Sequence, residues 1–416
     1  MRVALYTLGC KVNHYETQAM TELFEAAGHE VVPFMSQADV YIINTCTVTQ
    51  MSDKKSRQML SRAHAINPNA LVVAVGCYAQ VESEAVAKLE GVGLVVGTKG
   101  KKDIVRLCQE AIDGQGERIA AVDKEFEDLS ATHDSRTRAT LKIQDGCNRY
   151  CSYCIIPFAR GPLRSRSMKS CEKEIRALVE GGYKEIVLTG IQLCAYADGQ
   201  SDLCDVIKLC DKLGVCRLRL GSLEPNFVTE GFVETCKDSR CLCRQFHLSM
   251  QSGCDSVLER MNRHYTTAQY DAAVQRLRAD MPDCAITTDV ISGFVGETEQ
   301  EHRATMAFVE KIGFARIHVF PYSVRKGTKA AAMTGHNTKA VKESRARELI
   351  AVGAQLEEAF ALRQKDTKQE VLMEADGTGY TRSYVRVRCK GNEGELVRVK
   401  IIGQEGIIAL GERIEE

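Results

Sequence analysis

Three cysteines stand close together near the middle of the chain, in the stretch DGCNRYCSYC at residues 145–154. Cys147, Cys151 and Cys154 follow the spacing C-x3-C-x2-C, directly after a strand-like segment at 140–144. Three thiolates on one tight loop can bind three irons of a 4Fe-4S cluster and leave the fourth iron open. A closed structural zinc site would require a fourth protein ligand. The spacing therefore favours an iron–sulfur site over zinc.

A second set of three cysteines is spread over the N-terminal part of the chain. Cys10, Cys46 and Cys77 each follow an apolar strand-like segment and precede a helix-like one. In an open parallel sheet, ligands bind beyond the carboxyl ends of the strands, so these three side chains are expected to point to one edge. A second cluster with a free iron is one interpretation. Three cysteines that simply belong to the hydrophobic core are the other.

The segments that must position these cysteines form an α/β protein with a small C-terminal β-barrel. Residues 1–122 alternate strand and helix patterns, which predicts a parallel sheet covered by helices on both faces. The polar stretch 123–138 is interpreted as a linker. Six strand patterns within 139–365 predict a partial TIM-like barrel with its chemistry at the C-terminal strand ends. Short strand patterns and Gly-rich turns in 366–416 predict the small β-barrel.

Charge and targeting signals narrow the class of protein. The 416 residues carry 55 basic and 55 acidic side chains, so a polyanionic partner must be bound by local patches. The N-terminus reads as a strand rather than a secretory leader, and no apolar run approaches the roughly 20 residues of a membrane span. We therefore expect a cytoplasmic protein without membrane contact, in which grouped cysteines hold metal or do chemistry rather than form disulfides.

The cysteine loop at 145–154 resembles the cluster loop of the radical S-adenosylmethionine (SAM) enzymes. The resemblance implies that the open iron binds the amino and carboxylate groups of SAM. An electron from the cluster would then cleave SAM to methionine and a 5′-deoxyadenosyl radical. It also implies that Tyr153 packs near the adenine. A simple aromatic plug within the loop is the alternative for this residue.

The resemblance extends to the ends of further strands in the predicted barrel. It implies SAM contacts from Gly190 in LTG, Glu224 in SLEP, Gln251 in QSG and Gly293 in ISGFVGE. Glu224 would accept hydrogen bonds from the ribose or the amine, with a capping role or an ion pair as the alternative. Each motif is weak alone, because glycine after a strand is an ordinary turn signal. Their shared place on one rim gives them weight.

Longer stretches resemble the methylthiotransferases, including TLGCKVNHYET, INTCTV, GCYAQ, DGCNRYCSYCIIPFARGPLRSR and HLSMQSGCDSVLERMNR. They cover almost the full chain in that family's order, with an N-terminal cluster domain, a radical SAM barrel and a C-terminal TRAM β-barrel. The resemblance implies that Cys10, Cys46 and Cys77 bind a second 4Fe-4S cluster. TLGCKVN is most similar to the threonylcarbamoyladenosine tRNA branch. Gln192, Cys194 and Gly221 depart from that branch's usual residues, and Cys194 is assigned to packing.

Two basic segments predict contacts with RNA. Residues 136–169 hold eight Lys or Arg and one acid, which predicts phosphate contacts for Arg160, Arg164 and Arg166. A solvated surface or an anchor for the carboxylate of SAM is the alternative. In SYVRVRCK at 383–390, strand alternation places a basic row beside Tyr384 on the outer face of the barrel. That row consists of Arg386, Arg388 and Lys390.

The family resemblance implies an enzyme that adds a methylthio group to C2 of N6-threonylcarbamoyladenosine next to the anticodon. It would use two SAM molecules and two 4Fe-4S clusters. Its partners would be the anticodon stem-loop of tRNA and an electron donor such as flavodoxin or ferredoxin. The same chemistry on isopentenyladenosine tRNA or on a ribosomal-protein side chain is the nearest alternative. A radical SAM enzyme whose N-terminal cysteines are core, and a non-catalytic zinc-containing RNA-binding protein, are the others.

Overall fold

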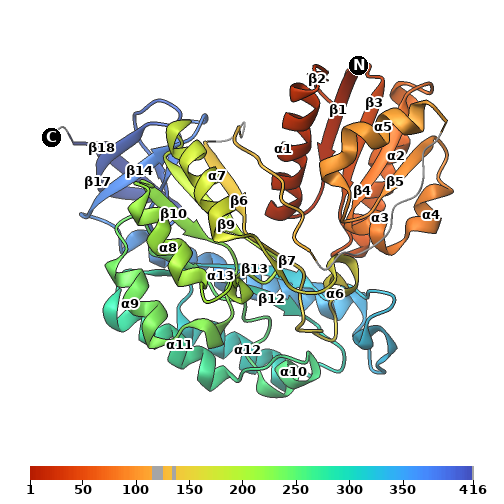
Figure 1. Cartoon of the computed structure of the whole chain (residues 1–416). Coiled ribbons are helices and arrows are strands. Elements are labelled where there is room, and N and C mark those ends of the chain that lie inside the picture. Colours follow the sequence, from red (N-terminus) through yellow and green to blue (C-terminus); the bar gives the residue numbers. More distant parts are fainter. Residues whose placement is uncertain (115–124, 134–136, 415–416) are drawn as a thin grey trace.

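The computed structural model of the chain describes residues 1–114, 125–133 and 137–414. Figure 1 shows an N-terminal α/β region, a partial barrel and a small C-terminal β-barrel. The N-terminal region and the C-terminal barrel both lie against the partial barrel, which joins them (Figure 1). The predicted fold class is confirmed.

The N-terminal region is a five-stranded parallel sheet in the order β2-β1-β3-β4-β5. Alternate residues of the central strands enter two separate hydrophobic clusters, one on each face, which is why these strands are apolar runs rather than alternating ones. The strands are β1 (Arg2–Thr7), β2 (Glu30–Val32), β3 (Val40–Thr45), β4 (Leu71–Gly76) and β5 (Val92–Val96). The helices are α1 (Lys11–Ala26), α2 (Gln50–Ile66), α3 (Cys77–Val81), α4 (Ser83–Ala87), η1 (Lys101–Asp103) and α5 (Ile104–Ile112).

The central region is a partial barrel of six parallel strands. Two three-stranded sheets, β10-β9-β6 and β11-β12-β13, are joined by parallel bridges that pair Leu218 with Leu242 and Leu223 with Leu248. The strands are β6 (Arg138–Lys142), β9 (Glu185–Thr189), β10 (Arg217–Leu220), β11 (Gln245–His247), β12 (Ala285–Ser292) and β13 (Arg316–Pro321). Each corresponds to one of the six strands that the sequence predicts.

Helices cover the outside of this barrel and short elements carry its cysteine loop. The covering helices are α7 (Met168–Glu180), α8 (Leu203–Lys212), α9 (Glu230–Asp238), α10 (Asp255–Arg260), α11 (Thr267–Asp280), α12 (Glu299–Ile312) and α13 (Lys339–Leu362). The short elements are β7 (Gln144–Asp145), α6 (Ile156–Arg160), β8 (Arg164–Ser165), η2 (Leu193–Ala195), η3 (Pro225–Phe227) and η4 (Lys329–Ala332). The strands β7 and β8 pair with each other, so the loop leaves and re-enters the barrel at one place.

The C-terminal region is a closed barrel in the order β14-β15-β16-β18-β17. Its strands are β14 (Lys368–Met373), β15 (Thr378–Thr381), β16 (Arg386–Arg388), β17 (Leu396–Glu405) and β18 (Ile408–Arg413). The sequence predicts a strand across 383–390, and this is wrong outside Arg386–Arg388. Tyr384 precedes the strand with a φ of 67°, a turn conformation that breaks the strand alternation.

The segment 123–138 falls only partly within the described residues, because 123–124 and 134–136 lie outside them. Residues 125–133 form no helix or strand, yet Leu129 and Ala131 are buried in the main core. The backbone carbonyl of Leu129 accepts a hydrogen bond of 2.5 Å from the hydroxyl of Tyr15 on α1. The domain boundaries themselves stay predictions. Within the described residues, no helix has the length and apolar character that crossing a membrane requires.

Candidate active site

The N-terminal cysteines meet at the carboxyl edge of the parallel sheet. Cys10 is the N-cap residue of α1, Cys46 follows β3, and Cys77 opens α3 directly after β4. Burial and the neighbouring thiols of Cys10 and Cys46 raise the pKa of the Cys77 thiol to about 11, although Arg160 opposes the rise. The three thiols are therefore close enough to influence one another electrostatically. Their strands β1, β3 and β4 are adjacent in the sheet.

The second set of cysteines lies on the loop that follows β7. Burial, together with the nearby thiols of Cys151 and Cys147, raises the pKa of the Cys154 thiol to about 12. The guanidinium of Arg263 donates a hydrogen bond of 3.2 Å to the sulfur of Cys151. Sequence reasoning missed Arg263, because nothing in its local pattern indicates that it reaches a loop 112 residues earlier.

Residues of the cysteine loop contact the ends of several barrel strands. Arg149 donates a hydrogen bond of 3.0 Å to Glu224 after β10, so the ion pair foreseen as an alternative for Glu224 is present. The ring of Tyr153 packs edge-on to Phe294 after β12, with ring centroids 6.2 Å apart. A Cβ at Gly190 would lie 2.9 Å from the side chain of Gln144, so the end of β9 needs a small residue there.

Two other residues predicted to bind SAM lie on the same side of the barrel. Gln251 has a left-handed φ of 66° and forms a bridge with Val290 on β12. Gly293 follows β12, and a Cβ there would lie 3.0 Å from the backbone of Lys342 on α13. The carboxyl ends of β9, β10, β11 and β12 thus bring Gly190, Glu224, Gln251 and Gly293 to one rim, although their contacts with a cofactor stay predictions.

The donor chemistry of both cysteine sets fits three irons of a cubane. Each set supplies three sulfurs, and the thiolate is the ligand that iron–sulfur clusters take. In the parts of the chain that the structure describes, no three His, Cys, Asp or Glu side chains gather as ligands of one metal ion. A cubane needs no such gathering, because each thiolate binds an iron of its own.

A buried arginine connects the two cysteine sets. Arg160 at the end of α6 is fully buried, and its Nε donates a hydrogen bond of 3.2 Å to the sulfur of Cys77. Its Nη1 lies 2.5 Å from Glu16 on α1 and 3.3 Å from Asp145, two residues before Cys147. The predicted phosphate contact of Arg160 is therefore wrong, because its guanidinium is shielded from solvent and already bound to carboxylates.

Arg164 and Arg166 are also wrong as predicted RNA contacts. Arg164 is 8% exposed and pairs with Asp145 at 3.1 Å. Arg166 is 3% exposed and pairs with Glu174 on α7 at 2.6 Å. The positive charge of these arginines in the segment 136–169 is neutralised in the fold by Asp145 and by acidic residues outside that segment.

The basic row of the C-terminal barrel remains at the surface. Arg386 pairs with Asp376, Arg388 pairs with Glu405, and Lys390 is exposed. Their contact with RNA stays a prediction. Tyr384 does not join this row, contrary to expectation.

Instead, Tyr384 turns toward the partial barrel. It stacks on Tyr380 with ring centroids 4.6 Å apart and lies against the guanidinium groups of Arg138 and Arg219. The reason is the turn at Tyr384, which places its side chain on the side that faces β6 and β10.

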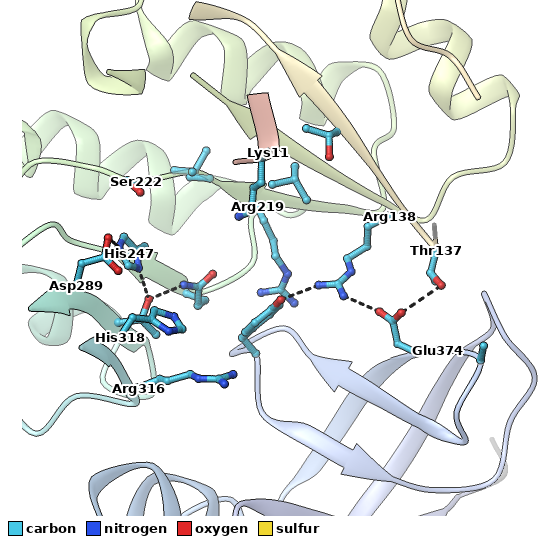
Figure 2. A pocket seen from close by; sticks show the side chains of 18 of the residues that line it. Lys11, Thr137, Arg138, Arg219, Ser222, His247, Asp289, Arg316, His318 and Glu374 are labelled. Atoms are coloured by element: carbon cyan, nitrogen blue, oxygen red, sulfur yellow. Dashed lines mark hydrogen bonds and ion pairs between the residues drawn. The ribbon is translucent and has the colours of Figure 1, made fainter. Parts of the chain in front are cut away.

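A cavity of about 630 Å³ occupies the interior of the partial barrel (Figure 2). Its wall is formed by alternate, and therefore inward-facing, residues of the strands. Most of these are polar, whereas the interior of an ordinary TIM barrel is filled by bulky aliphatic side chains. The inward-facing polar residues are Arg138, Thr140, Arg219, Gln245, His247, Thr287, Asp289, Arg316 and His318.

All three regions of the protein contribute to this cavity. Glu374 and Tyr384 of the C-terminal barrel line one end, and Lys11 at the start of α1 enters from the N-terminal region. Partial burial lowers the pKa of His318, Asp289 opposes the change, and Arg316 adds to it. Lys11 directly follows Cys10, so one residue of the cavity wall is the chain neighbour of a cysteine of the N-terminal set. Sequence reasoning missed this cavity, although the polar alternation along β11, β12 and β13 was a visible signal.

Gly9→Ala should reduce the iron bound by the N-terminal cysteines. Gly9 has a φ of 100°, and a Cβ there would lie 2.8 Å from both Cβ and Sγ of Cys46, so the loop must shift. After anaerobic reconstitution we expect iron to fall from about eight toward about four atoms per chain. Gly28→Ala is the control, because its φ of 79° gives similar backbone strain with no heavy atom within 4 Å of the added carbon. Equal iron contents in the two variants would contradict the prediction.

Family models match two regions of the chain. A model described as an uncharacterized protein family, UPF0004, matches residues 2–97, and a model of the radical SAM superfamily matches residues 141–309. These regions contain the N-terminal and the central cysteine sets, respectively.

Known proteins resemble almost the whole chain. Threonylcarbamoyladenosine tRNA methylthiotransferase MtaB of Bacillus subtilis is 41% identical, covering 96% of this chain and 93% of that protein. The protein of the same name from Aquifex aeolicus is 35% identical over 96% of this chain and 100% of its own length. The tRNA-2-methylthio-N(6)-dimethylallyladenosine synthase of Thermodesulfovibrio yellowstonii is 31% identical over 96% and 95%.

Solved structures support the fold. The radical S-adenosylmethionine methyltransferase TsrM from Kitasatospora setae, solved with cobalamin and a [4Fe-4S] cluster, aligns with a TM-score of 0.62. The alignment covers 79% of this chain and 77% of TsrM at 16% identity, so the similarity is one of fold alone.

Proposed function

Since this chain belongs to the radical SAM methylthiotransferase family, we propose that it adds a methylthio group to C2 of N6-threonylcarbamoyladenosine in tRNA, next to the anticodon. The enzyme uses SAM and 4Fe-4S clusters, and tRNA is its substrate. The C2–H bond of adenine is too weakly acidic for a side-chain base, so the reaction needs a radical.

The observation that carries this proposal is the contact of buried Arg160 with both cysteine regions. It binds the sulfur of Cys77 on one side and Asp145 beside the second loop on the other. A cluster bound to Cys147, Cys151 and Cys154 would supply the radical from SAM. A cluster bound to Cys10, Cys46 and Cys77 would supply the site of sulfur transfer. The chain's own residues hold the two sites at a fixed separation, because Arg160 and its partners are buried and fully engaged.

The proposed SAM contacts are Tyr153, Gly190, Glu224, Gln251 and Gly293. Their support is their position on the rim that also carries the cysteine loop. Glu224 is held by Arg149 of that loop, so its carboxylate has a defined orientation toward the rim. The ring of Tyr153 packs against Phe294, and this contact holds the side chain on the rim where the adenine of SAM would bind.

The target nucleoside would enter the barrel cavity. The cavity contains residues from all three regions, including Lys11 beside Cys10, and it is large enough for a modified base. Reaching it would require the adenosine to leave the stack of the anticodon loop. We propose that the stem-loop itself lies on the exposed row Arg386, Arg388 and Lys390, that flavodoxin or ferredoxin supplies electrons, and that the enzyme works in the cytoplasm.

Mass spectrometry of tRNA nucleosides tests the substrate. A strain that lacks the gene should contain N6-threonylcarbamoyladenosine without its 2-methylthio derivative, and the wild-type gene on a plasmid should restore the derivative. Purified, anaerobically reconstituted protein should convert a stem-loop with threonylcarbamoyladenosine and leave one with isopentenyladenosine unchanged. Restoration of only the isopentenyl product would reject the proposed substrate. Two equivalents of zinc without deoxyadenosine formation would reject the enzyme altogether.

A further inference from the structure

The cations of the barrel cavity differ in how far their hydrogen-bonding capacity is already used. Arg138 donates a hydrogen bond of 2.7 Å to Glu374 and one of 3.0 Å to the hydroxyl of Tyr384 (Figure 2). Arg219 pairs with Glu185 at 2.7 Å and donates to the backbone carbonyl of Thr381 at 2.7 Å. Both arginines therefore attach the C-terminal barrel to the partial barrel.

Arg316 is different from these two arginines. It extends from β13 into the cavity in Figure 2. Its contact with Glu357 joins only Nε to the carboxylate, at 3.7 Å, and its side chain is 42% exposed. Within the described residues, its two terminal nitrogens make no hydrogen bond. A guanidinium that presents its Nη groups to a cavity can bind a planar anion through two parallel hydrogen bonds.

The surroundings of Arg316 are polar on the cavity side. His318 is two residues further along the same strand. Asp289 lies opposite His318 on the neighbouring strand β12, and His247 lies on β11, the strand beyond it. Nε2 of His247 lies 3.4 Å from the carboxylate of Asp289, and Nδ1 of His247 shares a hydrogen bond of 3.1 Å with the hydroxyl of Thr287. These groups suit a ligand that carries hydroxyl and amide groups as well as a charge.

We infer that Arg316 binds the carboxylate of the threonylcarbamoyl group and thereby selects this nucleoside over a prenylated one. The inference rests on the proposed function and names the residue that recognises the threonylcarbamoyl group of the substrate. A dimethylallyl group in the same place offers no acceptor to the two Nη groups of Arg316. The prenylated nucleoside would therefore lack the charge-assisted hydrogen bonds that the carboxylate accepts, and this difference is the basis for discrimination.

The test compares two stem-loop RNAs that differ only in the carboxylate. One carries N6-threonylcarbamoyladenosine, and the other carries its primary amide. Fluorescence anisotropy on the reconstituted enzyme measures the dissociation constant of each RNA for the wild type, Arg316→Met and Arg316→Lys. The control is Arg303→Met on α12, an arginine with a side chain 77% exposed outside the cavity.

The wild type should bind the acid about 10- to 100-fold more tightly than the amide, the range expected for a hydrogen-bonded ion pair. Arg316→Met should weaken binding of the acid by that factor and leave the amide unchanged, so the preference disappears. Arg316→Lys should keep part of the preference, and Arg303→Met all of it. KM for the acid should follow the same order.

Two outcomes would overturn the inference. A preference that persists in Arg316→Met would show that another group binds the carboxylate. Equal weakening of acid and amide would show that Arg316 binds an RNA phosphate or supports the fold. The proposed function fails separately, through a wild-type enzyme that does not methylthiolate the threonylcarbamoyl RNA at all.

Discussion

Alanine in place of Cys10, Cys46 and Cys77 is expected to stop methylthio transfer while SAM cleavage continues. In the proposed function each cysteine set supplies the three thiolates of one cluster, so reconstituted iron should fall from about eight to about four atoms per chain. The loop with Cys147, Cys151 and Cys154 is untouched in this variant. The measurements are iron and sulfide content, 5′-deoxyadenosine formed with dithionite, and the methylthio nucleoside by mass spectrometry.

The reciprocal variant has alanine at Cys147, Cys151 and Cys154. It should form neither 5′-deoxyadenosine nor the methylthio nucleoside, and it should retain about four irons per chain. Cys194→Ala is a matched control for iron content, because this half-buried cysteine lies on the same rim and packs against the main core. It should keep about eight irons. Unchanged iron in the N-terminal variant would favour the alternative in which Cys10, Cys46 and Cys77 are core residues.

Arg160→Met is expected to lower the free energy of unfolding by about 3–5 kcal/mol, the usual cost of removing one partner of a buried ion pair. The change leaves Glu16 and Asp145 charged in the interior with fewer donors. Urea unfolding under anaerobic reducing conditions measures the loss. Arg176→Met on α7 is the control, because its side chain is 53% exposed and its ion pair should contribute less than about 1 kcal/mol.

The effect of Arg160→Met should also depend on pH. Burial alone would raise the pKa of Glu16, but Arg160, with Lys101 and Lys142, holds it well below its usual range. Such a carboxylate stabilises the fold above its unfolded pKa of about 4 and loses this contribution as the pH falls. Without Arg160 the pKa of Glu16 in the folded protein rises, so Glu16 is protonated at a higher pH and its unpaired charge is removed there. The difference from the wild type should therefore shrink between neutral pH and about pH 4, and a constant difference would argue for a loss of packing alone.

Arg160 also explains how two cysteine sets on separate sheets keep a common geometry. Its guanidinium contacts Asn13 and Glu16 on α1, Cys77 at the start of α3, and Asp145 beside the second loop. A substitution here should disturb both sites at once. Arg166 anchors α1 a second time, through Tyr15 and Glu174.

The sequence by itself determined the type of chemistry and the local segments that carry the cysteines. The spacing of Cys147, Cys151 and Cys154 is a property of one short loop. The six barrel strands and the placement of Cys10, Cys46 and Cys77 after strands follow from hydrophobic patterns within single segments. Such features depend on neighbours in the chain, so they can be recognised without knowing how distant segments pack.

Only the tertiary structure decided the environment of the charged residues. Arg160 resembles an RNA-binding residue in its local sequence, yet it is buried against Glu16, 144 residues away. Tyr384 leaves the outer face because a turn directs it onto Arg138 and Arg219. The open guanidinium of Arg316 likewise became visible only when the partners of the other cavity arginines were known. Burial and pairing set the role of a charge, and both are contributed by residues far away in the chain.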